Sequence, residues 1–241
     1  MTTICLDFGN TRLKTAVFEN EQLKEVIVLK EDASQHLQNI IDQYQPQNSI
    51  LSSVINHDIR LEELLNSKTI FHKLSNESKL PFTIPVRKPD TVGADRLAIA
   101  AASVFLFPSK NNLAIGLGSC ITYNFINKFN ELLGGSISPG MEMRFRSMHH
   151  FTAKLPFEQA DWNVPLIGYD TKTNLQSGVV LGMAKEIDGI IDLYTKKFNN
   201  FNVLLTGGDI GIFQPHLKSE IFADPDLIFK GLYAISHINN A

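Results

Sequence analysis

The sequence is poor in cysteine and contains no long apolar run. Two cysteines, Cys5 and Cys120, occur in 241 residues, which is too few for a disulfide framework and lacks the spacing of a metal site. The longest apolar run, residues 97–107, is shorter than the roughly 20 residues that a membrane-spanning helix needs. The first residues also lack the charged and then apolar layout of a signal peptide. We therefore expect a cytoplasmic protein without a membrane-spanning segment.

Basic clusters are missing as well. The formal net charge is −3, and no run of basic residues is longer than a pair such as Lys196–Lys197. Proteins that bind nucleic acid or attach to anionic membranes present a basic stripe or a polybasic segment. We therefore expect neither nucleic acid nor a membrane as partner, and a small soluble ligand is favoured.

Strand-like and helix-like segments alternate along the first part of the chain. Strands are predicted near residues 3–8, 14–18, 23–29, 49–53 and 69–74, with helices over 33–44 and 59–65. Three prolines within residues 80–91 predict an extended connector. It leads to a helix over residues 92–107, with Asp90 or Thr91 as the N-cap. This order is typical of an α/β layer fold.

The second part of the chain repeats this outline. Strands are predicted at residues 113–117, 121–126 and 202–205, and helices at 141–153, 175–198 and 227–238. In both parts, a strand leads through a turn of glycine and a hydroxyl side chain into another strand. A chain of this length can form one large domain or two small ones. We predict two domains, over residues 1–109 and 110–241.

The turn after the first strand has side chains that suit a phosphate group. Glycine permits a positive φ and a close approach of the backbone to a ligand, so Gly9 lets turn N–H groups face phosphate oxygens. Asn10 and Thr11 add side-chain donors, and Lys14 can neutralise the remaining charge. Asp7 can hold a hydrated magnesium ion, which prefers one or two carboxylates. A plain β-hairpin with a Gly-Asn turn is the alternative for this segment.

Two further turns of glycine and hydroxyl residues follow apolar strands. They are Gly118–Ser119 and Thr206–Gly207–Gly208. Two hairpin turns from different domains can hold the phosphates of a nucleoside triphosphate, while a Gly-Gly pair that opens a helix lets the backbone approach the nucleoside. The first two turns lead into strands, so they are neither a Walker A loop nor a GxGxxG turn. Three ordinary turns of an α/β protein remain the alternative.

The predicted helix after the proline-rich connector begins with Gly93-Ala94-Asp95-Arg96. An aspartate in a first helical turn often only complements the helix dipole. Next to a phosphate site, the ionised carboxylate of Asp95 can also accept a proton from an alcohol that attacks a phosphoryl group. We expect this aspartate to be ionised at neutral pH without an unusual pKa. Arg96 can bind a carboxylate through two parallel hydrogen bonds.

Together these motifs resemble the type III pantothenate kinases, which belong to the superfamily of acetate and sugar kinases, Hsp70 and actin. Further segments of the resemblance follow in family order over nearly the whole chain. They are Gly134-Gly135-Ser136-Ile137, Pro139-Gly140, Leu155-Pro156, and Asp170-Thr171 seven residues before Gly178.

The resemblance implies an α/β fold of two ribonuclease H-like domains, with a nucleotide cleft between them. It also implies phosphorylation of pantothenate to 4′-phosphopantothenate, the first step of coenzyme A biosynthesis. ATP with Mg²⁺ is the implied cofactor, and the family typically forms a homodimer that completes the substrate pocket near its interface.

The resemblance assigns roles to individual residues. Asp95 would be the catalytic base. The phosphate cradle of ATP, with Mg²⁺ held by Asp7 through water, would consist of Asp7, Phe8, Gly9, Asn10, Thr11, Arg12, Leu13, Lys14 and Ser119. Gly207 and Gly208 would complete the ATP site. Pantothenate would contact Gly93, Ala94, Asp95, Arg96 and Thr171.

Four positions depart from the family pattern. Ser119 replaces a usual threonine and keeps the hydroxyl, and Asp170 replaces a usual asparagine. Many members carry an aspartate two residues before the second turn glycine, where it holds a monovalent cation, but this sequence has Gly116. A K⁺ or NH₄⁺ ion would therefore need other oxygen ligands. Val86 replaces a common tyrosine, which alters one wall of the substrate pocket. Two alternatives stay open: a catalytically silent regulatory or accessory member of the family, and another small-molecule kinase or polyphosphate hydrolase of the superfamily.

Overall fold

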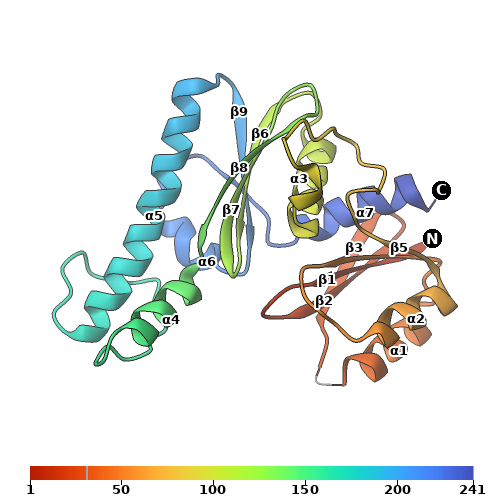
Figure 1. Cartoon of the computed structure of the whole chain (residues 1–241), viewed down its shortest axis with the longest axis horizontal. Helices are drawn as coiled ribbons and strands as arrows, with labels where there is room; N and C mark the ends of the chain where they lie inside the picture. The colour runs from red at the N-terminus through yellow and green to blue at the C-terminus, as the bar shows by residue number, and fades with distance from the viewer. Residues whose placement is uncertain (31, 241) are drawn as a thin grey trace. The chain divides into compact units, whose positions relative to one another are not determined.

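The computed structural model describes residues 1–30 and 32–240 and consists of two compact units (Figure 1). Unit 1 comprises Met1–Pro108, Asn130–Leu133 and Asp226–Ala241, and unit 2 comprises Ser109–Phe129 and Gly134–Pro225. These bounds differ from the predicted 1–109 and 110–241, because the last helix packs within unit 1. Residue 241, the predicted end of the second domain, and residue 31 lie outside the described residues.

Unit 1 contains a mixed five-stranded sheet. Its strands are β1 (Thr2–Phe8), β2 (Leu13–Glu19), β3 (Gln22–Val28), β4 (Asn48–Ser53) and β5 (Ile70–Lys73), in the order β3-β2-β1-β4-β5. The β1–β2 and β2–β3 pairs are antiparallel, whereas β1–β4 and β4–β5 are parallel. β1 and β4, at the centre, therefore end at the same edge of the sheet.

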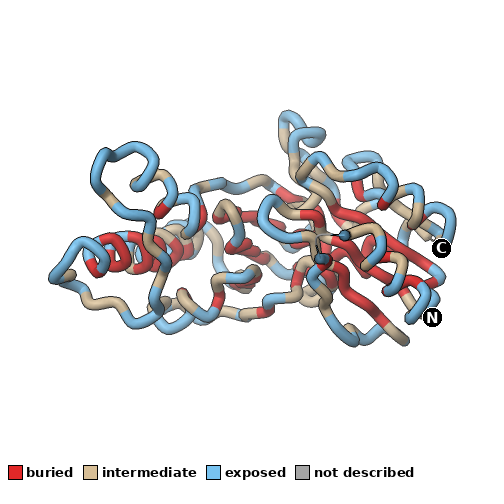
Figure 2. Tube along the Cα trace, turned by 90° about the horizontal axis from the view of Figure 1, so that it is seen from below, coloured by how far each residue is buried: buried red, intermediate tan, exposed pale blue. Residues whose placement is uncertain are grey.

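Alternation along β1 divides its side chains between the two faces of this sheet. Ile4, Leu6 and Phe8 are buried in one apolar cluster with α1 (Ala33–Tyr44) and α2 (Ile59–Lys68). The intervening side chains point to the other face. There α3 (Ala94–Leu106) and α7 (Leu227–Asn239) pack on the strands and on one another. Figure 2 shows the buried segments of the chain in red.

The contact between α3 and α7 is close because Gly231 has no side chain. A Cβ atom built on Gly231 would lie 1.8 Å from the carbonyl oxygen of Ala98. On the same side of the sheet, Tyr233 of α7 stacks on Phe18 of β2, with ring centroids 4.4 Å apart. The C-terminal helix is therefore part of the core of unit 1.

Unit 2 contains a second mixed sheet. It is formed by β6 (Asn111–Leu117), β7 (Cys120–Ile126), β8 (Leu132–Pro139), β9 (Phe201–Gly207) and β10 (Phe222–Ala223), in the order β10-β9-β6-β7-β8. β6 and β7 are antiparallel, and β6–β9 and β9–β10 are parallel. When the strands of each sheet are numbered in chain order, both sheets have the order 3-2-1-4-5. The halves of the chain thus repeat one topology.

The helices of unit 2 are α4 (Met141–Phe151), α5 (Thr171–Lys197) and α6 (Ile210–Phe213). The predicted start of the long helix at residue 175 was four residues too late. Asp170 accepts a hydrogen bond from the Thr173 amide and Thr173 bonds back to the Asp170 amide, a capping box that starts α5 at Thr171. No described helix is both long enough and apolar enough to span a membrane.

One other helix prediction was wrong in detail. The N-cap of α3 is Gly93 rather than Asp90 or Thr91, which lie in a separate 3₁₀ turn, Pro89–Thr91. The Gly207–Gly208 pair is followed by the single turn of α6 and then by another 3₁₀ turn, Gln214–His216. The Gly-Gly pair therefore precedes a helix, as predicted, and that helix is a single turn.

Candidate active site

Strand register in unit 1 gathers polar side chains at one edge of its sheet. Asp7 of β1 is the Cα partner of Lys14 in β2 and of Ser52 in β4. All three side chains point to the sheet face that α3 and α7 cover, because they alternate with the residues of the opposite apolar cluster. Ser52 was not among the predicted site residues, because its register with β1 depends on a long-range strand pairing.

Asp95 approaches this group from the first turn of α3. The pKa of Asp7 is raised to about 7, first by burial and then by the negative charge of Asp95. The charge of Lys14 and the hydrogen bond from the Ser52 hydroxyl act in the opposite direction. Two carboxylates from distant parts of the chain therefore share one electrostatic environment. The structure brings together Asp7, Lys14 and Asp95, all of them predicted site residues.

The carboxylate of Asp95 also faces the N-terminus of its own helix. Burial raises its pKa, and hydrogen bonds from the backbone N–H groups of Arg96 and of Asp95 itself, together with the charge of Arg96, act in the opposite direction. The expectation of an ordinary pKa was therefore wrong. The helix N-terminus does favour the carboxylate, but loss of hydration has the larger effect.

Gly93 leaves the space that this carboxylate occupies. Its φ is −61°, which any residue can adopt. A Cβ atom built on Gly93 would lie 2.5 Å from Oδ1 of Asp95. The glycine is therefore required by the position of the aspartate rather than by the backbone conformation.

The turn between β1 and β2 is short and largely exposed. The amide of Gly9 donates to the carbonyl of Arg12, 3.2 Å away. Gly9 is not among the glycines with a positive φ, and a Cβ atom built on it would lie 3.6 Å from the nearest atom, an ordinary contact. The expected positive φ was therefore wrong, and the close approach of a ligand to Gly9 stays a prediction.

The predicted phosphate residues of this segment differ in exposure. Asn10, Thr11 and Arg12 are exposed, whereas Phe8 is fully buried and Leu13 packs against the same apolar cluster. The side chains of Phe8 and Leu13 thus anchor the turn in the apolar core. Only the backbone groups of these two residues are available to a ligand.

In unit 2, the Gly118–Ser119 turn joins β6 to β7. The amide of Gly118 donates to the Cys120 carbonyl at 3.1 Å, and the amide of Gly140 donates to the Ser119 carbonyl at 3.0 Å. A Cβ atom on Gly140 would lie 2.2 Å from the Gly118 carbonyl oxygen. The Pro139–Gly140 motif therefore packs directly against this turn and supports it.

The third turn lies beside the second because β6 and β9 are parallel. Leu117, which precedes Gly118, is the Cα partner of Gly207. Gly207 has a φ of +116°, and a Cβ atom on it would lie 2.0 Å from the Leu117 carbonyl oxygen, so both conformation and space require glycine. A Cβ atom on Gly208 would meet no atom within 4 Å. Unit 2 thus presents two neighbouring backbone turns at one sheet edge.

Thr171 is the exposed first residue of α5. It belongs to unit 2, whereas the Gly93–Arg96 segment belongs to unit 1. Hydrogen bonds of the adjacent Asp170 carboxylate with Thr173 lower the pKa of Asp170. Thr171 is therefore placed by a well-formed helix start.

The donor set of unit 1 fits a hydrated magnesium ion. Asp7 and Asp95 repel one another, and a cation beside Asp7 would relieve this repulsion and favour its ionised form. Magnesium usually retains several waters and takes one or two carboxylates together with substrate phosphate. Among the described residues there is no group of three or more His, Cys, Asp or Glu side chains that could hold a metal ion.

A cavity of about 660 Å³ lies elsewhere in unit 2. It is lined by the end of α5, the start of β9 and the segment around Ser219. Gly207 stands at the other end of β9. This cavity is therefore separate from the predicted turns.

Comparisons with known proteins agree on one family. The sequence model of the family described as type III pantothenate kinase matches residues 3–193. A protein of Christiangramia forsetii described as a type III pantothenate kinase is 40% identical over 238 residues, which is 98% of each chain. A protein of Flavobacterium johnsoniae with the same description is 37% identical over 232 residues, or 95% of each chain.

Solved structures show the same fold at low sequence identity. The activator of the 2-hydroxyisocaproyl-CoA dehydratase from Clostridium difficile, with bound ADPNP, has a TM-score of 0.53 at 12% identity and covers 100% of this chain and 94% of its own. Component A of the (R)-2-hydroxyglutaryl-CoA dehydratase from Acidaminococcus fermentans has a TM-score of 0.53 at 11% identity, with 100% and 98% coverage. The predicted fold class, two ribonuclease H-like units of the actin, Hsp70 and sugar kinase type, is confirmed by these likenesses and by the repeated strand order.

Proposed function

The chain belongs to the type III pantothenate kinase family and phosphorylates pantothenate in coenzyme A biosynthesis, and we propose that Asp95 is the general base of this reaction. The observation that carries this assignment is the proximity of Asp95 to Asp7 at the edge of the unit 1 sheet. One carboxylate can then serve the metal and the other the alcohol.

In the proposed reaction, the hydroxyl oxygen of pantothenate attacks the γ-phosphorus of ATP. Asp95 accepts the proton of this hydroxyl in the same step. The bond between the γ-phosphorus and the β,γ-bridging oxygen breaks, and ADP leaves with that oxygen. The raised pKa makes the Asp95 carboxylate a stronger base than an exposed aspartate. The Gly93 backbone leaves room for this carboxylate at the start of α3.

The phosphates of ATP are assigned to the three turns. Residues 7–14 would provide backbone N–H groups, the Asn10 and Thr11 side chains and the Lys14 ammonium, and Ser119 would add its turn. Gly207 and Gly208 would lie next to the nucleoside. ATP would bind together with Mg²⁺, which screens phosphate charge when bound, and Asp7 would hold this ion through water.

The acceptor pocket is assigned to Gly93, Ala94, Asp95, Arg96 and Thr171. A guanidinium group binds a carboxylate through paired hydrogen bonds, so Arg96 would hold the carboxylate of pantothenate. Val86 would replace the aromatic wall that is common in the family. Gly116 offers no carboxylate to a monovalent cation, so we expect turnover to depend little on K⁺.

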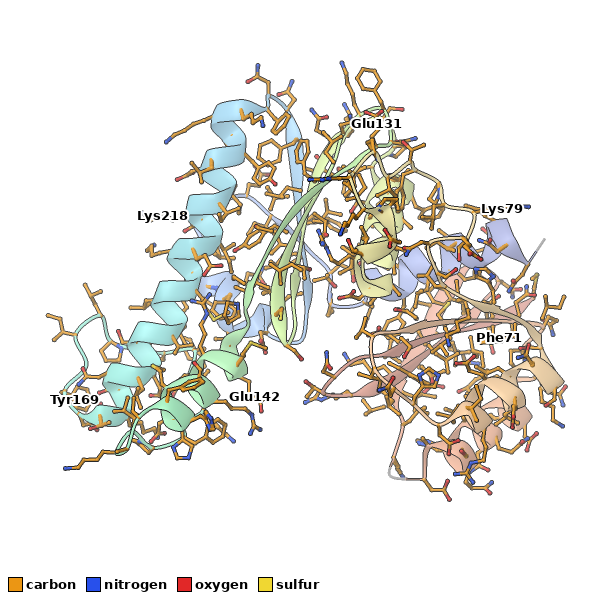
Figure 3. The ribbon with its side chains drawn as sticks, in the orientation of Figure 1. Phe71, Lys79, Glu131, Glu142, Tyr169 and Lys218 are labelled. Atoms are coloured by element: carbon orange, nitrogen blue, oxygen red, sulfur yellow. The ribbon has the colours of Figure 1, made fainter. Side chains whose placement is uncertain are left out.

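The segment before α5 supports a homodimer. Leu166, Ile167 and Tyr169 are each more than 80% exposed (Figure 3 labels Tyr169). Neighbouring apolar side chains of this size seldom stay in water unless they meet a partner. We propose that a second copy of the chain covers these three side chains, which lie close to Thr171 in the sequence.

We also propose that the enzyme works in the cytoplasm. Its small-molecule partners would be ATP and pantothenate.

Mass spectrometry tests the proposed function directly. Purified protein with ATP, Mg²⁺ and pantothenate should yield phosphopantothenate, and the Asp95→Asn variant should yield very little. Phosphate release that does not need pantothenate would indicate a hydrolase. Absence of product with the wild-type protein would favour a silent accessory role.

A further inference from the structure

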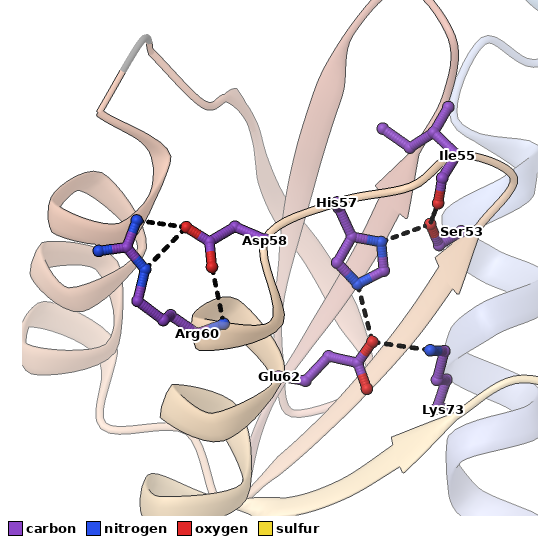
Figure 4. Close-up of polar contacts among 7 residues, drawn as sticks. All are labelled: Ser53, Ile55, His57, Asp58, Arg60, Glu62 and Lys73. Carbon is purple, nitrogen blue, oxygen red and sulfur yellow. Dashed lines mark hydrogen bonds and ion pairs between the residues drawn. The ribbon is translucent and has the colours of Figure 1, made fainter.

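In unit 1, four polar side chains near the end of β1 are linked by hydrogen bonds (Figure 4). Nδ1 of His57 lies 2.8 Å from Oγ of Ser53, and Nε2 lies 2.8 Å from Oε1 of Glu62. Lys73 donates to the same Glu62 oxygen at 2.7 Å. The residues come from β4, the loop after it, α2 and β5, so the imidazole joins several elements.

The hydrogen bonds fix the His57 ring at both nitrogens. Burial raises the pKa of Glu62, but the hydrogen bonds from Lys73 and His57 outweigh it and lower that pKa overall. An ionised Glu62 can only accept, so Nε2 of His57 carries a hydrogen. The Ser53 hydroxyl, which has one hydrogen, lies within hydrogen-bond distance of Nδ1 of His57 and, at 3.1 Å, of the carbonyl oxygen of Ile55. With 7% of its side chain exposed, the ring has little freedom to turn.

The fixed ring supports Phe8. The two ring centroids are 5.2 Å apart with an interplanar angle of 78°, an edge-to-face contact. Phe8 is fully buried and is the last residue of β1, directly before Gly9. Its carbonyl accepts from the amide of Val54, 3.1 Å away, and Phe8 is the Cα partner of Ser53. Side chain and backbone of Phe8 are thus both held by the segment that carries His57.

We propose that His57 is a positioning residue for the phosphate turn at Gly9–Thr11. By bracing Phe8 and the end of β4, the locked imidazole holds the end of β1 and so sets where the turn's N–H groups point. A turn that binds phosphate through its backbone depends on such orientation. The proposal rests on the proposed function of this turn, and no contact of His57 with ATP is needed.

The test compares nucleotide and pantothenate binding in matched variants. His57→Phe keeps a ring against Phe8 but loses both nitrogen hydrogen bonds. We expect the Kd for a non-hydrolysable ATP analogue with Mg²⁺, measured by calorimetry, to rise roughly tenfold, while the KM for pantothenate stays within about twofold. His72→Phe is the matched control, because Nε2 of His72 bonds the Ser78 hydroxyl at 2.8 Å and alternation along β5 places His72 on the sheet face opposite to the cluster that contains Phe8. It should leave both constants unchanged.

Two milder variants keep the test decisive if His57→Phe does not fold. Ser53→Ala removes the partner of Nδ1, and Glu62→Gln keeps an oxygen for Nε2 but removes the charge. We expect Ser53→Ala to weaken nucleotide binding severalfold and Glu62→Gln to weaken it less. Unchanged nucleotide affinity in Ser53→Ala, or equal weakening of both substrates in His57→Phe, would overturn the proposal.

The same data separate this proposal from the proposed function. If the wild-type protein binds the nucleotide but forms no phosphopantothenate, the kinase assignment fails while the calorimetric comparison still decides the role of His57. If the wild-type protein does not bind the nucleotide, both fail.

Discussion

The carboxylate of Asp95, in the first turn of α3, raises the pKa of Asp7, at the end of β1. The two residues meet because alternation in β1 turns Asp7 toward the sheet face on which α3 packs. Phosphoryl transfer to an alcohol needs one group beside the metal and another beside the hydroxyl. In the proposed function, this pair would provide both within unit 1.

Asp95→Asn should lower the turnover of pantothenate by roughly 10²- to 10⁴-fold, because the amide cannot accept the hydroxyl proton. Substrate binding should largely survive. Steady-state kinetics measure the effect, and a thermal melt is the control. If the variant melts earlier yet phosphorylates pantothenate at a nearly normal rate, Asp95 is only a helix cap.

Asp7→Asn should stabilise the protein at alkaline pH in the absence of Mg²⁺ and nucleotide. The pKa of Asp7 rises from 3.8 to about 7, so the folded protein keeps this proton at pH values where the unfolded chain has lost it. Ionised Asp7 therefore costs stability, and the cost grows from about pH 4 to about pH 7 and is constant above. The melting temperature of Asp7→Asn should exceed that of the wild type at pH 8, with no gain near pH 4.

The exposed Asp42 on α1 gives a control for this experiment. Asp42→Asn should change the melting temperature little at either pH.

Asp7→Asn should also lose most of the Mg²⁺ dependence of turnover. Unchanged Mg²⁺ dependence would remove Asp7 from the metal site.

Gly93→Ala should lower turnover roughly tenfold to a hundredfold, because the new methyl group occupies the position of the Asp95 carboxylate. Gly189→Ala on α5 is the matched control, since a Cβ atom there meets no atom within 4 Å. That control should keep full activity and gain up to about 1 kcal/mol of stability. Normal turnover in Gly93→Ala would show that the carboxylate tolerates displacement.

Arg96→Ala should raise the KM for pantothenate by roughly tenfold to a hundredfold, because it removes a charge-assisted hydrogen bond to the substrate carboxylate. The KM for ATP should stay nearly constant. Initial rates with each substrate varied in turn measure both values. Weakened ATP binding with normal pantothenate binding would contradict this role.

Replacing K⁺ by Na⁺ should change turnover less than about twofold, because Gly116 supplies no oxygen ligand from a side chain. The two Cα partners of Gly116 in neighbouring strands are Thr122 and Thr206, which carry hydroxyl groups only. Rates measured at constant ionic strength test this expectation. A strong, saturable activation by K⁺ would show that these or other oxygens form a cation site.

Local signals in the sequence were enough to predict the secondary structure around several residues of the candidate site. The apolar run before Gly9 predicted β1, and the first turn of the predicted helix contained Asp95. The family resemblance added the order of the motifs. Each of these signals lies within a few neighbouring residues.

Features that depend on long-range packing could not be predicted in this way. Ser52 joins Asp7 only through the parallel pairing of β4 with β1. The raised pKa of Asp95 results from burial by elements distant in sequence. Likewise, Gly93 has to be a glycine because the Asp95 carboxylate lies beside it. The sequence does not show in which direction the Asp95 side chain points.

The placement of α7 affects how the chain acquires its structure during synthesis. Domains generally fold as units while the ribosome still adds later residues. Here the sheet that begins at Thr2 is covered by a helix that ends at Asn239, and Gly231 fits against Ala98 without room for a side chain. Unit 1, whose strands β1 to β5 emerge well before α7, therefore completes its core only after α7 has left the ribosome, and a nascent chain that stops short of α7 exposes that core.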